Sequence, residues 1–300
     1  MTWRPARISV KLKALVCAAA CLLVVAAWTD ASAQEMALFD GIKIESGALP
    51  VVVHGLSLNL EVRIFRPKGE GPFPLVVINH GTPNNTALAR GMKLDFARPA
   101  LWFAENGFLA VVAMRPGFGR SDGPYMEASE ECINRDYVRD GRETAEVESA
   151  IVASASRLAG ADRSRIIVVG HSAGGFGAIA LADDPPPGVV GIISFAGGRG
   201  GDDNESICGG KARLIEATRT LGKSNRLPQL WLYAENDHFF PPALGRRLFE
   251  VYSQGTAEPM TFVDMPSFGR DGHMAFSGAD PSVWAQPVSS FLKTVTHRDG

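Results

Sequence analysis

The sequence predicts an α/β protein with a mostly parallel central sheet and helices on both faces. Apolar stretches of strand length alternate along the chain with longer segments of helical spacing, an order of elements that builds a parallel sheet. The central stretches are apolar throughout, as expected of strands covered on both faces. With 300 residues and 46% hydrophobic content, the chain is long enough for one large domain.

The first expected strands, Val51–His54 and Leu58–Phe65, look like an antiparallel pair. The second alternates apolar and polar residues, which predicts a half-exposed strand at the edge of the sheet. Further strands are expected at Leu75–Ile78, Phe108–Met114, from Arg165 onward, Val189–Phe195, Gln229–Ala234 and Met260–Val263. Helices are expected at Pro99–Asn106, Asp136–Leu158, after Ser172 and near Lys211–Leu221. Internal repeats and long low-complexity linkers are absent from the sequence, so residues 34–300 are interpreted as one domain.

The N-terminus has the composition of a secretory signal peptide. Basic residues through Lys13 precede an apolar run from Ala14 to Trp28, and Ala31–Ala33 supplies an A-x-A cleavage site. The pattern predicts a signal peptide over residues 1–33, cut before Gln34, and a secreted or periplasmic protein. An uncleaved anchor is the alternative, although the run of about 15 residues is shorter than the ~20 that span a bilayer.

The charge balance argues against nucleic acid as a partner. The whole chain has a formal net charge of −2. Residues 1–33 hold four basic and one acidic side chain, so residues 34–300 carry 26 basic and 31 acidic side chains. A mildly acidic chain without a run of Lys or Arg lacks the electrostatic signature of a nucleic-acid binder. The expected partner is a small molecule, and membrane contact is expected only through the signal peptide during export.

Two cysteines remain after the predicted cleavage, Cys132 and Cys208. Both lie in polar, glycine-rich stretches that follow expected strands, so both belong at the carboxyl edge of the sheet. In an oxidising compartment an even pair favours a disulfide, with two separate free thiols as the alternative.

The sequence contains two Gly-x-Ser-x-Gly motifs, at Gly119–Gly123 and Gly170–Gly174. A nucleophile elbow of this type needs a strand before the serine and a helix after it. Ser172 has that setting, because a buried apolar strand precedes it and a helix of small residues follows. Ser121 follows a strand, but Pro124 and a polar segment come next. Ser172 is therefore the predicted nucleophile, and Ser121 is interpreted as a structural loop serine.

Five motifs together carry a resemblance to a known superfamily. They are Asn79-His80-Gly81-Thr82, Arg115–Gly123, Gly170–Gly174, Tyr233–Asp237 followed by Pro241-Pro242, and Asp271-Gly272-His273. In order and spacing the chain resembles the α/β-hydrolase superfamily over nearly its whole mature length, and within it the dienelactone-hydrolase-like and small carboxylesterase branch. The resemblance implies an α/β-hydrolase fold. The short segment between Phe195 and Gln229 predicts a small cap or none.

The base is expected after the serine, because the superfamily orders its residues as serine, acid and histidine. Three histidines follow Ser172. His238 adjoins the expected acid, so it is badly placed to bond that acid and reach the serine as well. His297 lies near the C-terminus, beyond the last helix. His273 follows the last expected strand, where the family's catalytic histidine lies, and it is the predicted base.

Asp237 is the predicted acid of the triad. It follows the strand Gln229–Ala234, and a buried carboxylate there fixes the tautomer of the histidine and stabilises the imidazolium. Glu235 is the near competitor, and Asp264 is the alternative for members that carry the acid elsewhere. A cap of the helix that starts near Pro241 is a structural role that Asp237 could also fill.

An oxyanion hole needs two preorganised donors. The superfamily pattern implies the N–H of Ala173, the residue after the nucleophile, and the N–H of Thr82 in the loop after Leu75–Ile78. That loop reads His-Gly-Thr-Pro, which departs from the three-glycine form of hormone-sensitive-lipase-like esterases. His80 precedes the serine in the chain, so it is interpreted as a residue that shapes the loop.

These residues predict a serine hydrolase that cleaves carboxylic esters through an acyl-enzyme. Activity should fall as acid protonates the histidine base. A peptidase or amidase of the same fold is the first alternative, although the chain has no room for the propeller of prolyl oligopeptidases. Dehalogenases and epoxide hydrolases of the superfamily use an aspartate at the elbow, and a non-catalytic binding protein would usually have lost a triad residue.

The sequence predicts neither a metal site nor a cofactor. The histidines show no i, i+4 pair and the two remaining cysteines no CxxC spacing, and no dinucleotide or phosphate-loop motif follows a strand. Six aromatic residues are candidates for an acyl pocket, although such residues more often pack in cores: Trp102, Phe118, Phe239, Phe240, Phe268 and Phe276. A fairly open cleft suits short-chain or bulky esters better than long triglycerides.

Overall fold

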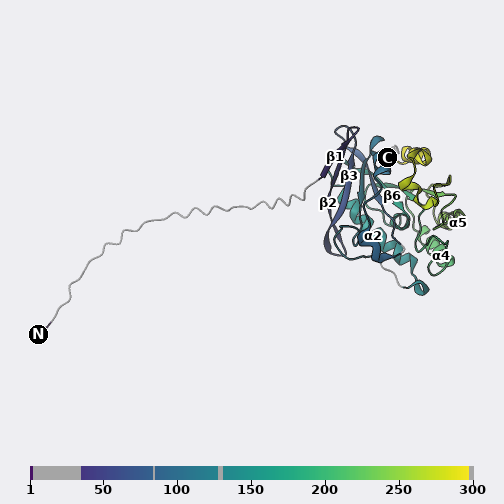
Figure 1. The fold of residues 1–300 in the computed structure, drawn as a ribbon, viewed down its shortest axis with the longest axis horizontal. Helices are drawn as coiled ribbons and strands as arrows, with labels where there is room; N and C mark the ends of the chain where they lie inside the picture. The colour runs from purple at the N-terminus through teal and green to yellow at the C-terminus, as the bar shows by residue number, and fades with distance from the viewer. Residues whose placement is uncertain (3–34, 84, 128–130, 297–300) are drawn as a thin grey trace. The chain divides into compact units, whose positions relative to one another are not determined.

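The computed structural model describes residues 1–2, 35–83, 85–127 and 131–296. Apart from its first two residues, the predicted signal peptide lies outside the described residues. The strands are β1 (Glu35–Phe39), β2 (Ile42–Val53), β3 (Leu56–Arg66), β4 (Phe73–Asn79), β5 (Leu109–Ala113), β6 (Ala161–His171), β7 (Val189–Phe195), β8 (Gln229–Ala234) and β9 (Met260–Met265). In the described part of the chain they form one nine-stranded sheet (Figure 1).

The strands lie in the order β1-β2-β3-β5-β4-β6-β7-β8-β9. Pairing is antiparallel from β1 through β3 to β5 and parallel between all later neighbours. The predicted antiparallel pair is confirmed, since Val51 lies opposite Leu58. The predicted edge position of Leu58–Phe65 is wrong, because β3 lies between β2 and β5. Residues 35–53 supply β1 and β2, which extend the sheet beyond β3.

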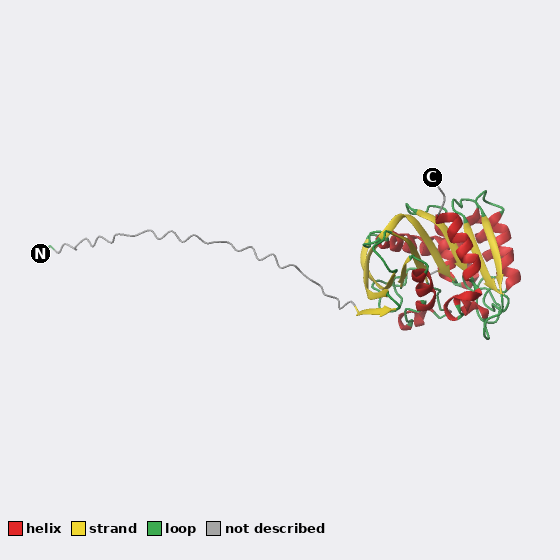
Figure 2. Ribbon diagram, turned by 90° about the horizontal axis from the view of Figure 1, so that it is seen from above, coloured by secondary structure: helices red, strands yellow, loops and turns green. Residues whose placement is uncertain are grey.

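Helices cover both faces of the sheet, as predicted (Figure 2). One face carries α2 (Tyr137–Ala155), α3 (Ala173–Leu181), α4 (Lys211–Gly222) and α5 (Pro242–Ser253), and the other carries α1 (Ala97–Glu105), α6 (Ala275–Gly278) and α7 (Ala285–Thr296). Short 3-10 helices are η1 (Thr86–Gly91), η2 (Cys132–Asn134), η3 (Gly272–Met274) and η4 (Pro281–Val283). The fold is therefore the predicted mostly parallel α/β architecture.

Strand β4 shows why the central strands are apolar without interruption. Leu75 and Val77 pack into the core on the α2 face, whereas Val76 and Ile78 pack into the core on the α1 face. Successive side chains of a strand point to opposite faces, so a strand with two covered faces needs apolar residues at every position.

Helix α2 is shorter than the sequence predicts. It begins at Tyr137, because the Asp136 side chain accepts a hydrogen bond from the N–H of Arg139 as a helix cap. The expected helix continued to Leu158, but the N–H of that residue donates to the carbonyl of Ala155 and turns the chain toward β6. The segment after the last helical turn is therefore a tight turn.

Cys132 and Cys208 form a disulfide across 76 residues of sequence. It ties η2 to the loop between β7 and α4, and residues 196–210 form this loop instead of a cap domain. Such bonds persist in oxidising compartments, which agrees with an extracellular or periplasmic location. None of the helices in the described ranges has the length and apolar character to span a bilayer.

Candidate active site

Ser172 lies on a strained turn between β6 and α3. Its backbone has φ +56° and ψ −120°, a conformation that costs a non-glycine residue roughly 1–3 kcal/mol. Three backbone hydrogen bonds hold the turn. The N–H of Ser172 donates to the carbonyl of Phe195 at 3.0 Å, and the carbonyl of Ser172 accepts from the N–H groups of Phe176 and Gly198 at 2.9 and 3.1 Å. Strain at a sharp strand-to-helix turn presents the Oγ atom at the edge of the sheet, as a nucleophile elbow requires.

The two glycines of the motif are required by the closeness of the backbone. A Cβ atom on Gly170 would run into the carbonyl of Gly174. A Cβ atom on Gly174 would lie 2.5 Å from the carbonyl oxygen of His80, in the loop after β4. Because these neighbours are backbone atoms, a larger residue would force the elbow and the β4 loop apart.

The structure brings Asp237 and His273 together beside the elbow. His273 Nδ1 lies 3.1 and 3.2 Å from the two carboxylate oxygens of Asp237, and the two side chains are 6% and 0% exposed. The Oδ1 atom of Asp237 also accepts the N–H groups of Phe239 and Phe240 at 2.9 and 2.8 Å. The acid is thus held in place by backbone donors, and it orients the imidazole through Nδ1.

The competing candidates lie in other settings. Glu235 is exposed and accepts a hydrogen bond from Ser267, and Asp264 is 47% exposed and pairs with Arg246. Ser121 is buried, donates to the carbonyl of Met114 at 2.6 Å and accepts from the N–H of Glu61 at 2.9 Å, so it serves the loop. His297 lies outside the described residues.

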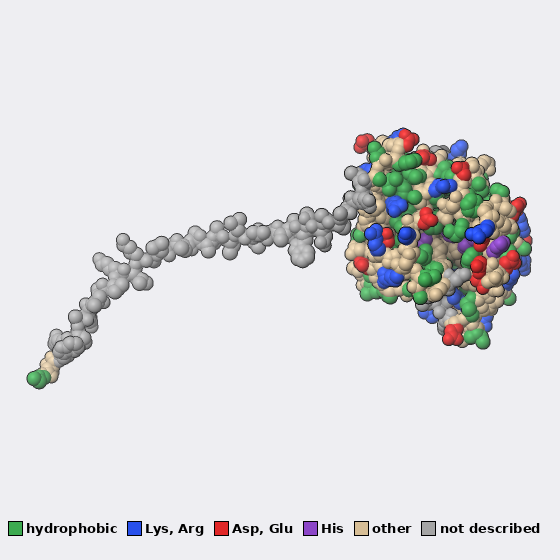
Figure 3. Space-filling model, viewed as in Figure 1, with side chains coloured by type: hydrophobic (Ala, Val, Ile, Leu, Met, Phe, Trp, Pro, Cys, Tyr) green, Lys and Arg blue, Asp and Glu red, His purple; other side chains and the backbone are tan. Residues whose placement is uncertain are grey.

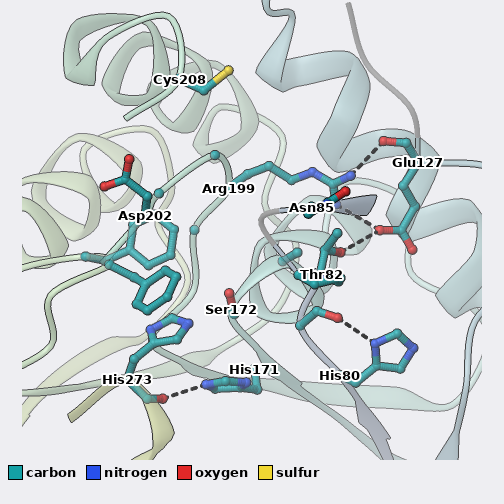
Figure 4. A pocket seen from close by; sticks show the side chains of 18 of the residues that line it. His80, Thr82, Asn85, Glu127, His171, Ser172, Arg199, Asp202, Cys208 and His273 are labelled. Carbon is teal, nitrogen blue, oxygen red and sulfur yellow. Dashed lines mark hydrogen bonds and ion pairs between the residues drawn. The ribbon is translucent and has the colours of Figure 1, made fainter. Parts of the chain in front are cut away.

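His171, inside the elbow motif, was missed by the sequence reasoning. Its Nε2 lies 2.7 Å from the carbonyl oxygen of His273 (Figure 4), so this nitrogen carries the proton and donates. Burial, followed by the neighbouring His273, lowers the pKa of His171 to about 3. The ring of His171 is therefore neutral at ordinary pH, and its hydrogen bond fixes the backbone of His273, the predicted base.

The loop after β4 carries Thr82, the second predicted oxyanion donor. In the described part of the chain, the N–H groups of Thr82 and Ala173 donate to no loop or cap acceptor. His80 stabilises this loop, because its Nδ1 donates to the carbonyl of Gly81 at 2.6 Å and its Nε2 accepts from the N–H of Arg115 at 3.0 Å. Burial and the charge of Arg115 lower the pKa of His80 to about 3, so the ring stays neutral.

A buried group of charges lies behind this loop and was also missed by the sequence reasoning. Arg115 and Arg199 both form ion pairs with Glu127, and the three side chains are 0%, 2% and 1% exposed. We call them the Arg115–Glu127–Arg199 cluster. Arg199 also donates to the hydroxyl of Tyr125 at 3.1 Å. The available signal was an arginine placed directly after a fully apolar strand, since a buried charge needs a partner.

A cleft of ≈ 1150 Å³ opens over Ser172. Its walls include Ser172, Ala173, Thr82 and His273, together with the disulfide and Glu127 (Figure 4). Of the six aromatic candidates, Phe239 and Phe240 line the cleft, and the ring of Phe239 stacks on His273 at 4.4 Å. The other four pack into the cores: Trp102, Phe118, Phe268 and Phe276.

The described ranges contain no group of three or more His, Cys, Asp and Glu side chains that could hold a metal ion. The groups assembled at this edge of the sheet are a serine on a strained turn, an imidazole, a buried carboxylate and backbone N–H groups. Such a set performs acyl transfer by itself, with the histidine moving the proton.

A sequence model of the X-Pro dipeptidyl-peptidase (S15) family matches residues 55–227. The chain belongs to this family. The matched segment contains Thr82, Ser172 and Ala173, whereas Asp237 and His273 lie beyond it. No curated protein sequence matches the chain.

Three solved structures similar to this S15-family chain show the α/β-hydrolase fold. An acetyl xylan esterase from Paenibacillus sp. R4 has a TM-score of 0.60 and 14% identity, covering 88% of this chain and 89% of its own. Porphyromonas gingivalis dipeptidyl peptidase 4 has a TM-score of 0.59 and 14% identity, and the match covers 84% of this chain and 35% of the peptidase chain. A putative dienelactone hydrolase from Klebsiella pneumoniae has a TM-score of 0.56 and 16% identity, and the match covers 85% of this chain and 99% of the hydrolase chain. The S15 family match confirms the predicted superfamily and supports an enzyme of the serine-hydrolase kind, and the solved structures agree in fold.

Proposed function

We propose that this protein hydrolyses carboxylic esters, with Ser172 as nucleophile, His273 as base and Asp237 as acid. The observation that carries the proposal is the strained elbow of Ser172 at the cleft, beside an imidazole that bonds a buried carboxylate at 3.1 Å. A serine hydroxyl is a poor nucleophile until a neighbouring base takes its proton, and this arrangement supplies the base.

In the proposed reaction, His273 takes the proton of Ser172 Oγ as that oxygen attacks the ester carbonyl. The N–H groups of Ala173 and Thr82 donate to the resulting oxyanion. His273 then gives the proton to the departing alcohol, and a water molecule activated by the same ring hydrolyses the acyl-enzyme. Asp237 stabilises the imidazolium in each half of the cycle. The proposed chemistry uses no cofactor.

The chemistry of the cleft supports an ester of uncharged groups as the substrate. Its charged lining residues are of both signs, Lys93, Asp95, Glu127, Arg135, Arg199 and Asp202, and the carboxylate of Glu127 is paired with two arginines. Apolar side chains form much of the remaining wall: Leu88, Met92, Phe96, Ile207, Phe239, Phe240 and Met274. Acyl and aryl groups are stabilised on such surfaces. We further infer that the protein is exported, since it holds a disulfide, and that it acts on a small molecule bound in the cleft. We also infer that it has no nucleic-acid partner, since charges of both signs are interspersed on the face that Figure 3 shows.

A fluorophosphonate probe should label the wild-type protein at Ser172, because the probe reacts with serines that a base activates. Ser172→Ala should abolish labelling, whereas Ser121→Ala, which alters the other Gly-x-Ser-x-Gly motif, should retain it. Mass spectrometry of the labelled peptide identifies the site. Absence of labelling in folded wild-type protein would contradict the proposal that Ser172 is an activated nucleophile.

A peptidase is the second candidate, favoured by the match to the X-Pro dipeptidyl-peptidase family. The two functions separate in a panel of nitrophenyl esters graded by acyl length and Xaa-Pro nitroanilides. A nitrophenyl ester reacts faster under either function, because it releases the better leaving group, so the anilides decide between the two. We expect no measurable hydrolysis of the Xaa-Pro nitroanilides, since the cleft is mostly apolar. Hydrolysis of an anilide with a kcat/KM within about 100-fold of that for the best ester would identify the protein as a peptidase.

A further inference from the structure

Three loops at the carboxyl edge of the sheet meet at the carboxylate of Glu127. The loop after β4 contributes Thr82, the segment after β5 contributes Arg115, and the loop after β7 contributes Arg199. The Oε2 atom of Glu127 accepts from Thr82 Oγ1 at 3.1 Å, from Arg115 Nη2 at 3.2 Å and from Arg199 Nη1 at 2.9 Å. Figure 4 shows the Thr82 and Arg199 contacts on the cleft wall.

The hydroxyl of Thr82 is fixed in both of its roles. It donates to Glu127 and accepts from Arg115 Nη2 at 3.3 Å. A hydroxyl that donates and accepts at once loses its freedom to rotate. The side chain therefore anchors the backbone of Thr82, whose N–H is the proposed oxyanion donor.

The same cluster holds the other end of the loop. Arg115 donates from its backbone N–H to His80 Nε2 at 3.0 Å, and its Nη1 donates to the carbonyl of His80. Residues 80–82 are thus attached to the cluster at the histidine ring, the histidine carbonyl and the threonine hydroxyl. A loop attached at three points keeps one backbone conformation.

We propose that Glu127 is a positioning residue, which fixes the N–H of Thr82 for the oxyanion through the Thr82 hydroxyl and the two buried arginines. The proposal rests on the proposed function, in which this N–H stabilises the tetrahedral intermediate. Donors that are already oriented need no reorganisation during the reaction, which is the source of their large effect. A donor displaced by a fraction of an ångström loses much of it.

The electrostatics of the cluster make it a stable anchor. Burial alone would raise the pKa of Glu127, but the charges of Arg115 and Arg199 and their hydrogen bonds outweigh burial and hold it well below its ordinary value. The carboxylate therefore stays ionised at neutral pH. It remains an acceptor for Thr82 while the histidine base changes its protonation.

Removing Glu127 itself would leave Arg199 with only its longer ion pair to Asp140, at 4.0 Å, and would take from buried Arg115 the carboxylate it bonds, which destabilises the fold strongly. A sharper test removes only the hydrogen bond between the Thr82 hydroxyl and Glu127. Thr82→Val keeps the shape and the backbone N–H but lacks the hydroxyl, and Thr82→Ala lacks it with a smaller side chain. The matched control is Thr218→Val in α4, because the hydroxyl of Thr218 also donates a hydrogen bond, to the carbonyl of Leu214 at 2.8 Å, but lies fully buried away from the cleft.

We expect both Thr82 variants to lower kcat for a nitrophenyl ester by about 10- to 100-fold with little change in KM, since a displaced oxyanion donor weakens the transition state. Thr218→Val should keep the wild-type kcat, with each variant assayed well below its own Tm. Wild-type kcat in either Thr82 variant overturns the positioning role, as does an equal loss in Thr218→Val. Failure of the proposed function is distinct, since the wild-type protein would then lack ester hydrolysis and labelling.

Discussion

Replacing Asp237 by asparagine should lower kcat for an ester by about 10⁴-fold, which is roughly 5 kcal/mol of activation free energy. The reason lies in the hydrogen bonds of the carboxylate. Its Oδ1 accepts the N–H groups of Phe239 and Phe240, while Oδ2 lies 3.1 Å from His273 Nδ1. An asparagine would keep its carbonyl oxygen toward the two N–H groups and so turn its amide group toward the histidine.

That orientation reverses the tautomer of the base. An amide N–H that donates to His273 Nδ1 leaves the ring proton on Nε2, so no acceptor faces the serine. Because the change is nearly isosteric, KM and Tm should change little. Asp264→Asn is the matched control, since the sequence offers Asp264 as the alternative acid of the triad and its side chain is 47% exposed. Comparable losses in both variants, or a loss below tenfold in Asp237→Asn, would contradict the assignment of the acid.

The fold and the elbow could be predicted because each depends on patterns of neighbouring residues in the sequence. An apolar strand, a glycine turn and a small-residue helix lie within 20 residues around Ser172. The positions of Asp237 and His273 came from chain order, and the structure brings these two residues into contact. The edge of the sheet was misjudged because alternation in Leu58–Phe65 reports exposure of a face and carries no information about neighbouring strands.

The supporting contacts could not be predicted because they join distant residues. Glu127 bonds Thr82 across 45 residues and Arg199 across 72, and His171 reaches the carbonyl of His273 across 102. Each depends on which loops the sheet order places side by side. Periodicity reports burial of a residue along its own element, but it does not identify partners contributed by other loops.

Glu148, in the middle of α2, illustrates a buried group whose role the catalytic cycle does not explain. It is fully buried, and neither carboxyl oxygen has a hydrogen-bond partner among the described residues. Its carboxyl group faces Gly177 of α3, beside the methyl group of Thr144 from α2. Burial raises the pKa of Glu148 well above its ordinary value, opposed by Arg115 and Arg199 and assisted by Glu127. Burial therefore favours the protonated, neutral form of this carboxyl group in the folded protein.

This proton makes the stability of the fold depend on pH. An unfolded glutamate releases its proton above a pH of about 4.3, so folding at higher pH must take a proton up. The free energy of unfolding then falls by about 1.4 kcal/mol per pH unit until the buried carboxyl ionises. Stability from this group is complete below the unfolded pKa and is lost as the pH rises toward the raised folded pKa.

Glu148→Gln should remove this dependence, because glutamine has a similar shape and no proton to release. Relative to the wild-type protein, the variant should gain unfolding free energy as the pH rises from 6 to 8, by at most about 1.4 kcal/mol per pH unit, measured by urea unfolding at each pH. Glu146→Gln on the same helix is the control, since Glu146 is 56% exposed and its change should stay within about 0.5 kcal/mol at both pH values. A difference between Glu148→Gln and wild type that is constant with pH would mean that Glu148 is ionised in the fold. In that case Arg115 and Arg199, which already act on Glu148, would compensate the buried charge.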